Sequence, residues 1–184
     1  ARIIDAASRL VTVPDALSGE STEWEPALAS AGALSGFMQT HETLNRANAI
    51  DFLAFSPDNP SSIRNCLDTA RANARAIRTA LTAEMWEALN GAWLELKRFD
   101  NTDMDRHQLN TFLAAVKEAC LRFDGSAYRT MLRNDAYWFL RLGFYLERAD
   151  NTARILDVKY WILLPDSEVI GGSLDTYQWS TILR

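Results

Sequence analysis

The segment from Thr130 to Leu164 constrains the fold more than any other part of the chain. It contains no proline and a single glycine, Gly143, and it is dense in aromatic, arginine and carboxylate side chains. Proline and glycine are the residues that most disfavour a helix interior. The segment therefore predicts one long helix, or two helices divided near Asn134. Any fold of this chain must accommodate such long helical rods.

The remaining segments repeat apolar residues at the three- and four-residue spacing of amphipathic helices, and none alternates apolar and polar residues as a strand does. Asn59 followed by Pro60 predicts a helix start, Thr82 predicts another, and Asp124–Gly125 predicts a turn. The fold class is therefore all-α, a multi-helix bundle in a single domain over residues 1–184. Besides the opening segment, helices are expected over about residues 1–13, 22–32, 42–55, 60–81, 82–100 and 107–123.

Composition excludes several classes of function. The chain has 184 residues, of which 48% are hydrophobic and 23% charged, as in ordinary globular domains. Its net charge of −5 disfavours nucleic-acid binding, which needs clustered lysine and arginine. The longest apolar runs are far too short to span a membrane, so a cytoplasmic location is favoured. Cys66 and Cys120 both fall within apolar helical patterns, which predicts two reduced, buried thiols rather than a disulfide.

A short string recurs at the two ends of the chain. Residues 1–6 read ARIIDA and residues 153–158 read ARILDV, and a tryptophan follows each copy, at Trp24 and Trp179. This similarity predicts an internal duplication, with the first repeat over about residues 1–127 and the start of the second over about residues 130–184. The chain is then expected to be an internal window of a longer protein.

The opening segment also carries a polar constellation. At about 100° per residue, Glu147, Asn151 and Arg154 share one narrow sector of the helix, with Asp150 and Asp157 beside it. Apolar residues flank this sector on both sides, which predicts a helix largely enclosed by neighbours and a partly buried polar groove. In one interpretation the groove is a ladder of ion pairs that orients packed helices. In the other, Arg154 holds a carboxylate or phosphate and Glu147 acts as a base or ligand.

Familiar catalytic signatures are absent from the sequence. There is no phosphate-binding GxxxxGK[ST] or GxGxxG string, and His41 and His107 are isolated, with no HExxH. Two histidines and two cysteines, widely separated, do not match the ligand spacing of a zinc site. We therefore expect neither a cofactor nor a metal.

Four strings are distinctive beyond their helical pattern. They are DNPSS at Asp58–Ser62, TMLRND at Thr130–Asp135, ERADNTARILDVKY at Glu147–Tyr160 and YQW at Tyr177–Trp179. Together they resemble the bacterial alpha-E family, over essentially the whole chain. The resemblance implies a helical, mostly cytoplasmic protein of unknown function. It also implies companions, encoded beside it or fused to it, of the ATP-grasp-type peptide ligase and transglutaminase-like classes.

The resemblance also singles out the residues of two of these strings as candidate site residues. The candidates in the first string lie at helical spacing, and those in the second lie where a helix is expected to kink or end. They are Glu147, Arg148, Asn151, Arg154 and Asp157, with Arg133, Asn134 and Asp135.

Three functions remain open from the sequence. The first is an accessory helical module that binds a peptide ligase, a transglutaminase-like protein or a peptide. The second is an enzyme that acts on a peptide or amino-acid carboxylate in the Glu147–Asn151–Arg154 groove. The third is a purely structural duplication whose polar ladders hold two halves together.

Overall fold

A computed structural model describes residues 24–99, 106–157, 172–173, 176 and 179–180 of the chain. Over these residues the secondary structure consists of helices without strands, which confirms the all-α prediction. The α-helices are α2 (Trp24–Ser30), α3 (Leu34–Thr40), α4 (Arg46–Ala54), α5 (Ile63–Ala76), α6 (Ala83–Leu96), α7 (Arg106–Thr130) and α8 (Asp135–Asp157), with a 3₁₀ turn at Arg78–Ala80. The helix expected over residues 1–13 lies outside the described residues.

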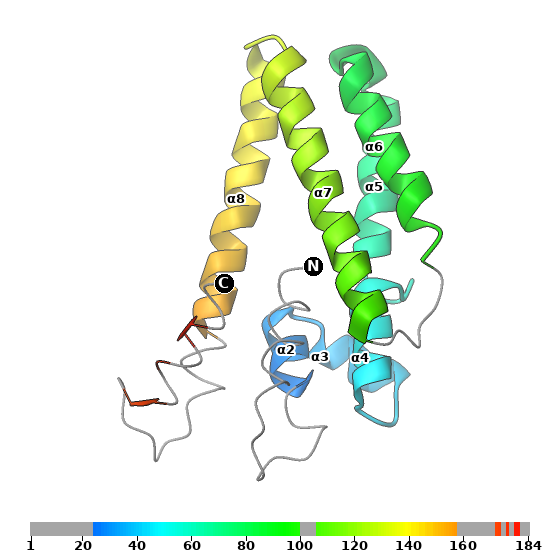
Figure 1. Cartoon of the computed structure of the whole chain (residues 1–184), viewed down its shortest axis with the longest axis vertical. Helices are drawn as coiled ribbons and strands as arrows, with labels where there is room; N and C mark the ends of the chain where they lie inside the picture. Colours follow the sequence, from blue (N-terminus) through cyan, green and yellow to red (C-terminus); the bar gives the residue numbers. More distant parts are fainter. Residues whose placement is uncertain (1–23, 100–105, 158–171, 174–175, 177–178, 181–184) are drawn as a thin grey trace.

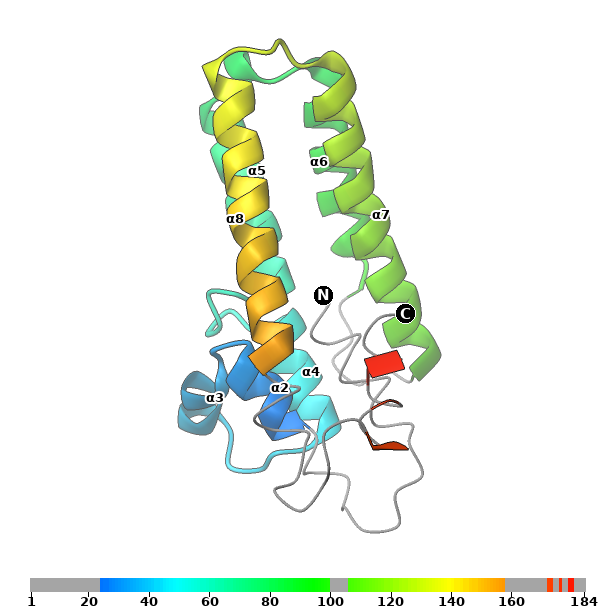
Figure 2. The same ribbon diagram turned by 90° about the vertical axis from the view of Figure 1, so that its left-hand side faces the viewer.

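The long helices stand beside one another over a base of short ones (Figure 1). α6 packs against both α5 and α7, and α2, α3 and α4 gather at the base. α7 and α8 are joined by a short turn at the far end and run back towards the base as separate rods (Figure 2). α8 therefore has a less enclosed position than the other long helices.

Two apolar clusters hold this arrangement together. The larger lies at the base, where Trp24, Phe37, Phe52 and Phe112 are all at most 1% exposed. Burying a side chain of this size stabilises a fold by about 1.5–3 kcal/mol relative to leaving it in water. The smaller cluster joins α6, α7 and α8 at the far end, and its buried members are Met85, Ala127, Met131 and Tyr137.

The connection between α4 and α5 differs from the expected helix start. Ser62, not Asn59, is the N-cap of α5, because its hydroxyl accepts from the Asn65 N–H at 3.2 Å. The Asn59 side chain turns inward and donates to the Phe52 carbonyl at 2.9 Å. Asn59 and Ser62 are both buried, so the DNPSS string is a structural corner of the fold. The predicted cap at Thr82 is confirmed, since its hydroxyl accepts from the Met85 N–H at 3.3 Å.

The turn expected at Asp124–Gly125 is wrong, because α7 continues through both residues to Thr130. A glycine inside a helix costs about 1 kcal/mol. Because the helix continues, Ala127 packs in the smaller apolar cluster, and this burial offsets the cost of the glycine. Arg141 of α8 forms an ion pair with Asp124, with its Nη1 2.7 Å from Asp124 Oδ1. The chain instead turns at residues 131–134, so the division expected near Asn134 is confirmed.

The prediction of two buried thiols is also wrong, since Cys66 and Cys120 are both exposed. α5 packs against α6 and the end of α4, which leaves the Cys66 side of its apolar stripe outside the core. On α7, Cys120 is exposed although the preceding residue, Ala119, is buried, and the next buried residue of the helix is Ala127. Both apolar stripes are therefore wider than the surfaces available to cover them.

Candidate functional site

The candidate polar residues of α8 face a largely open environment. Glu147 is exposed, and Asn151 and Arg154 are only partly covered. The expected enclosure of α8 is therefore wrong, and these residues do not line a buried groove. The physical reason is that α8 touches its neighbours mainly near its two ends, at the smaller apolar cluster and at α2.

Glu147 and Asn151 are joined to each other within α8. The Asn151 amide donates to the carboxylate of Glu147 and also, at 3.1 Å, to the backbone carbonyl of Glu147. This is the expected pairing of polar residues four positions apart on one helix face. Arg148, beside Glu147, is exposed. Asp157 is the last residue of α8, and its side chain lies outside the described residues.

Arg154 is committed to two acceptors. Its Nε donates to Asp150 Oδ2 at 2.7 Å, and its Nη1 donates to the Ser30 carbonyl at 3.0 Å. The hydrogen bond that Arg154 donates to Asp150, together with the negative charge of Asp150, raises the pKa of the guanidinium. Ser30 is the last residue of α2, and a cation at the carbonyl end of a helix is favourable. Arg154 therefore fastens the end of α8 to the end of α2.

The turn after α2 is shaped to receive this guanidinium. Gly32 has a φ of +67°, a conformation that side chains with a Cβ rarely adopt. A Cβ added at Gly32 would lie 3.4 Å from Nη1 of Arg154. The Ala33 N–H donates to the Leu28 carbonyl at 2.8 Å, which closes the end of the helix. Gly32 therefore allows both the positive φ of the turn and the close approach of the Arg154 guanidinium.

Arg133, Asn134 and Asp135 lie in the turn at the other end of α8. Arg133 donates to the Tyr128 carbonyl at 2.8 Å, and its guanidinium carbon lies 4.0 Å from the Tyr137 ring centroid. Asn134 Oδ1 accepts from the Tyr137 N–H at 3.4 Å, as an N-cap does, and Asp135 occupies the acidic first turn. These contacts stabilise the turn and the start of α8.

The two groups of candidate residues are too far apart to form one site. Nineteen helical steps separate Asp135 from Arg154, which at 1.5 Å per residue is about 28 Å. The structure brings together Glu147 with Asn151, and Asp150 with Arg154, but it does not bring the turn residues near either pair. A catalytic role for any of them stays a prediction.

One charge on α8 acts on a neighbouring long helix. The pKa of the Cys66 thiol is raised, mainly by loss of hydration and further by the negative charge of Glu147. Glu147 thus lies near enough to influence α5 electrostatically. A raised thiol pKa lowers the thiolate fraction of Cys66 at neutral pH.

Sequence reasoning missed an exposed apolar surface on α8. Its residues fall within a sector of about 120° around the helix. Phe139 is 73% exposed, Leu146 62% and Trp138 59%. We call this surface the α8 apolar face; its residues are Trp138, Phe139, Leu142, Tyr145, Leu146 and Leu156. The three- and four-residue spacing signalled it, but the sequence alone did not show that the described parts of the other helices leave it exposed.

Two searches bear on the chemistry of the described part of the chain. Among its residues no three histidine, cysteine or acidic side chains gather where they could hold a metal ion. None of its helices combines the length and apolar character needed to cross a membrane.

A comparison with known families is decisive for classification. The model of a family called Alpha-E, described as a predicted alpha-helical domain with a conserved ER motif, matches residues 1–184. The chain belongs to the Alpha-E family. Neither the curated proteins nor the solved structures include a match to it.

The Glu-Arg dipeptide occurs once in this Alpha-E chain, at Glu147–Arg148. Both residues lie in the middle of α8, next to Leu146 of the α8 apolar face. Glu147 orders Asn151 within the helix, whereas the guanidinium that reaches another helix belongs to Arg154. In this chain the dipeptide therefore sits on an exposed helix that is anchored at its ends.

Proposed function

We propose that this Alpha-E chain is an accessory module that binds an ATP-grasp-type peptide ligase through the α8 apolar face. The partner class follows from the resemblance of the sequence strings to a family whose members accompany such ligases. The observation that carries the binding role is the apolar face of α8, which stays exposed within the part of the chain that the structure describes. The role of the chain is then to hold or position a peptide-making enzyme rather than to perform the chemistry.

The size and arrangement of the face support a protein partner. Single exposed apolar residues are common on protein surfaces, but contiguous large ones mark interaction sites. Here two aromatic residues and a leucine, Trp138, Tyr145 and Leu142, are each more than half exposed on one helix. Aromatic residues are enriched where interfaces are most deeply buried. A helix face of this kind suits insertion into an apolar groove of a partner.

A charged residue borders the face. Asp150 is exposed and lies about 20° from Phe139 around the helix, whereas Glu147 and Arg148 are exposed about 60–80° beyond the edges of the face. A polar rim around an apolar centre is the usual anatomy of a protein–protein interface. On this proposal Asp150 contributes to the rim, where charges govern partner choice more than affinity.

The geometry gives less support to an enzyme active site at the Glu147–Asn151–Arg154 sector than to a binding role. A substrate carboxylate would have to compete with Asp150 and the Ser30 carbonyl for the Arg154 guanidinium. Glu147 is exposed and already accepts from Asn151, so it lacks the desolvated setting that tunes a general base.

Co-purification tests the proposal. The tagged chain and the ATP-grasp-type ligase encoded beside it would be mixed at micromolar concentrations of both, with the transglutaminase-like protein as a separate arm. We expect the ligase to be retained by the chain. Retention of the transglutaminase-like protein alone would replace the proposed partner, and retention of neither would contradict the proposal.

A further inference from the structure

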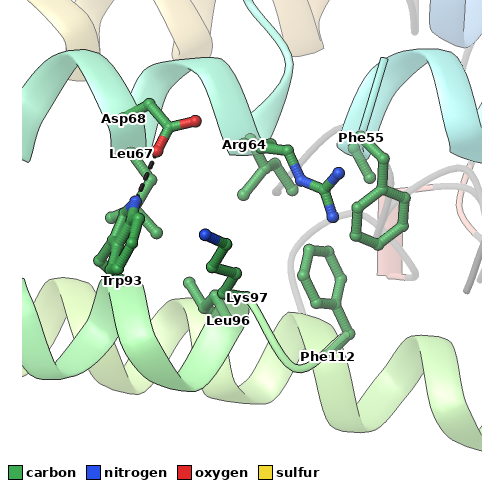
Figure 3. Close-up of a pocket in the computed structure, with 10 residues that line it drawn as sticks. Phe55, Arg64, Leu67, Asp68, Trp93, Leu96, Lys97 and Phe112 are labelled. Atoms are coloured by element: carbon green, nitrogen blue, oxygen red, sulfur yellow. Dashed lines mark hydrogen bonds between the residues drawn. The ribbon is translucent and has the colours of Figure 1, made fainter. Parts of the chain in front are cut away.

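A cavity of about 230 Å³ lies away from α8, where the end of α4 meets α5, α6 and α7 (Figure 3). Its inner wall is apolar and includes Phe55, Leu96 and Phe112, which are all buried. The rings of Phe55 and Phe112 contact each other, with centroids 5.0 Å apart. The cavity is therefore a preformed opening onto the main apolar cluster.

Two cations border this apolar wall. Arg64 comes from the first turn of α5, with its guanidinium carbon 5.4 Å from the Phe55 ring centroid. Lys97 caps the end of α6, with its Nζ 4.5 Å from the Trp93 ring centroid. Figure 3 shows the two side chains reaching into the cavity from opposite helices. The cavity thus combines an apolar wall with two positive charges.

The carboxylate that lines the cavity already accepts a hydrogen bond. Asp68 is the one carboxylate among the lining residues, and its Oδ1 accepts from the Trp93 indole N–H at 2.5 Å. That bond holds the indole against the wall formed by Leu67 (Figure 3). The lining has two cations and one carboxylate, but Asp51, outside the lining, also acts electrostatically on Arg64, so the attraction for an anionic ligand comes mainly from Lys97.

The combination selects the chemistry of the ligand. The volume lies below the roughly 300–1,000 Å³ of sites for drug-sized molecules, so it suits one side chain and one charged group. A guanidinium matches the two oxygens of a carboxylate, and the ammonium of Lys97 adds a second charge-assisted contact. The apolar wall disfavours a ligand as strongly hydrated as free phosphate.

We propose that this cavity binds a small apolar carboxylate. The class includes the C-terminal residue of a peptide that ends in phenylalanine or leucine, and free aryl or branched-chain carboxylic acids. The apolar group lies against Leu96 and Phe112, and the carboxylate lies between Arg64 and Lys97. The site is separate from the α8 apolar face, so its occupancy and partner binding can be measured independently.

Titrations followed by NMR test the proposal on the full chain. The probe signal is the indole N–H of Trp93, since it lies in the lining and is held by Asp68. The ligands are N-acetyl-Leu-Phe, its C-terminal amide and 3-phenylpropionate. We expect saturable shifts with both carboxylates and at least tenfold weaker binding of the amide. A response to N-acetyl-Leu-Phe alone would mean that the carboxylate comes from a peptide C-terminus, and a response to 3-phenylpropionate alone that it comes from a free acid. Either result would still support binding of a small apolar carboxylate.

Two variants, Lys97→Gln and Arg98→Gln, test whether Lys97 provides a charge that binds the carboxylate. Lys97→Gln is expected to weaken carboxylate binding by about tenfold, the loss of roughly one charge-assisted hydrogen bond. Arg98→Gln removes an exposed cation one residue away and should leave binding unchanged. Equal binding of acid and amide, no saturable shift with either acid, or equal affinities of Lys97→Gln and wild type would each overturn the proposal.

Discussion

Arg154 of α8 donates from Nη1 to the backbone carbonyl of Ser30, 124 residues earlier in the chain, at 3.0 Å. This single contact joins the end of the ER-motif helix to the end of α2 at the base of the molecule. Because the same guanidinium also holds Asp150, Arg154 acts as a fastening between helices.

Replacing Arg154 by alanine is expected to destabilise the chain. The substitution removes the hydrogen bonds to Asp150 and Ser30 and leaves the last carbonyl of α2 without its cation. We expect the free energy of unfolding to fall by about 1 kcal/mol, since Arg154 is partly exposed and its charge is screened. Urea denaturation would measure the change.

Arg148→Ala is the matched control for Arg154→Ala. Arg148 lies on the same helix and is exposed, so its removal should change stability by less than about 0.5 kcal/mol. Loss of a separable activity in Arg154→Ala, with unfolding unchanged from wild type, would instead favour a catalytic groove.

Asn59→Ala is expected to be more damaging than the position of Asn59 in a loop would suggest. Asn59 is only 4% exposed; it donates to the Phe52 carbonyl and accepts from the Ser61 N–H at 3.0 Å. Alanine leaves buried polar groups unsatisfied, which costs about 1–3 kcal/mol. Thermal denaturation should show a clear loss for Asn59→Ala and little for Asp58→Ala, an exposed neighbour; equal effects would refute the structural role.

The sequence predicted the helical class and several helix boundaries, because these follow from local spacing and capping. Thr82 illustrates this, since its cap depends only on the next three residues. The predicted start of α5 was wrong because the Asn59 side chain donates instead to the carbonyl of Phe52, a contact between the loop and α4. The predicted burial of Cys66 was wrong for a related reason. The apolar stripe of α5 indicates which face of the helix is apolar, but it does not indicate how much of that face a neighbouring helix covers.

The candidate site was predicted only in part. The spacing of Glu147 and Asn151 indicated that the two would meet, as they do. It could not show that Arg154 reaches Ser30, because that contact depends on the turn at Gly32 and on how α8 descends to the base. The cavity beside Trp93 was missed since its lining comes from four helices. The duplication of the chain stays a prediction.

Asp51 gives the chain a pH-dependent stability. Loss of hydration raises the pKa of its carboxyl, against the opposing charges of His41 and Arg64. The folded state therefore holds this proton more tightly than the unfolded state. The contribution of Asp51 is unfavourable at neutral pH and improves as pH falls through the raised folded-state pKa.

Asp51→Asn should consequently be more stable than wild type at pH 7. The advantage should shrink as pH falls through the raised folded-state pKa and vanish below about pH 3, where the wild-type group is largely protonated in both states. Denaturation curves at several pH values check this, with exposed Asp58→Asn as a comparison. An advantage that grows as pH falls would mean that the sign is wrong.

Glu147→Gln should make Cys66 more reactive. Removing the negative charge lowers the pKa of the thiol and increases its thiolate fraction, so alkylation by iodoacetamide at neutral pH should speed up by about twofold. The measurement uses a Cys120→Ser background so that Cys66 is the reacting thiol. Glu87→Gln, an exposed carboxylate on α6, should leave the rate unchanged; no difference between the two variants would place Glu147 farther from α5.

The most direct test of the central claim is the affinity of the ATP-grasp-type ligase for variants of the α8 apolar face. Isothermal titration would compare wild type with Leu146→Asp and with Leu94→Asp, which alters an exposed leucine on α6. We predict that Leu146→Asp weakens binding at least tenfold, by removing an apolar contact and burying a charge, while Leu94→Asp binds as wild type. Equal affinities for all three chains would contradict the claim that this face receives the partner.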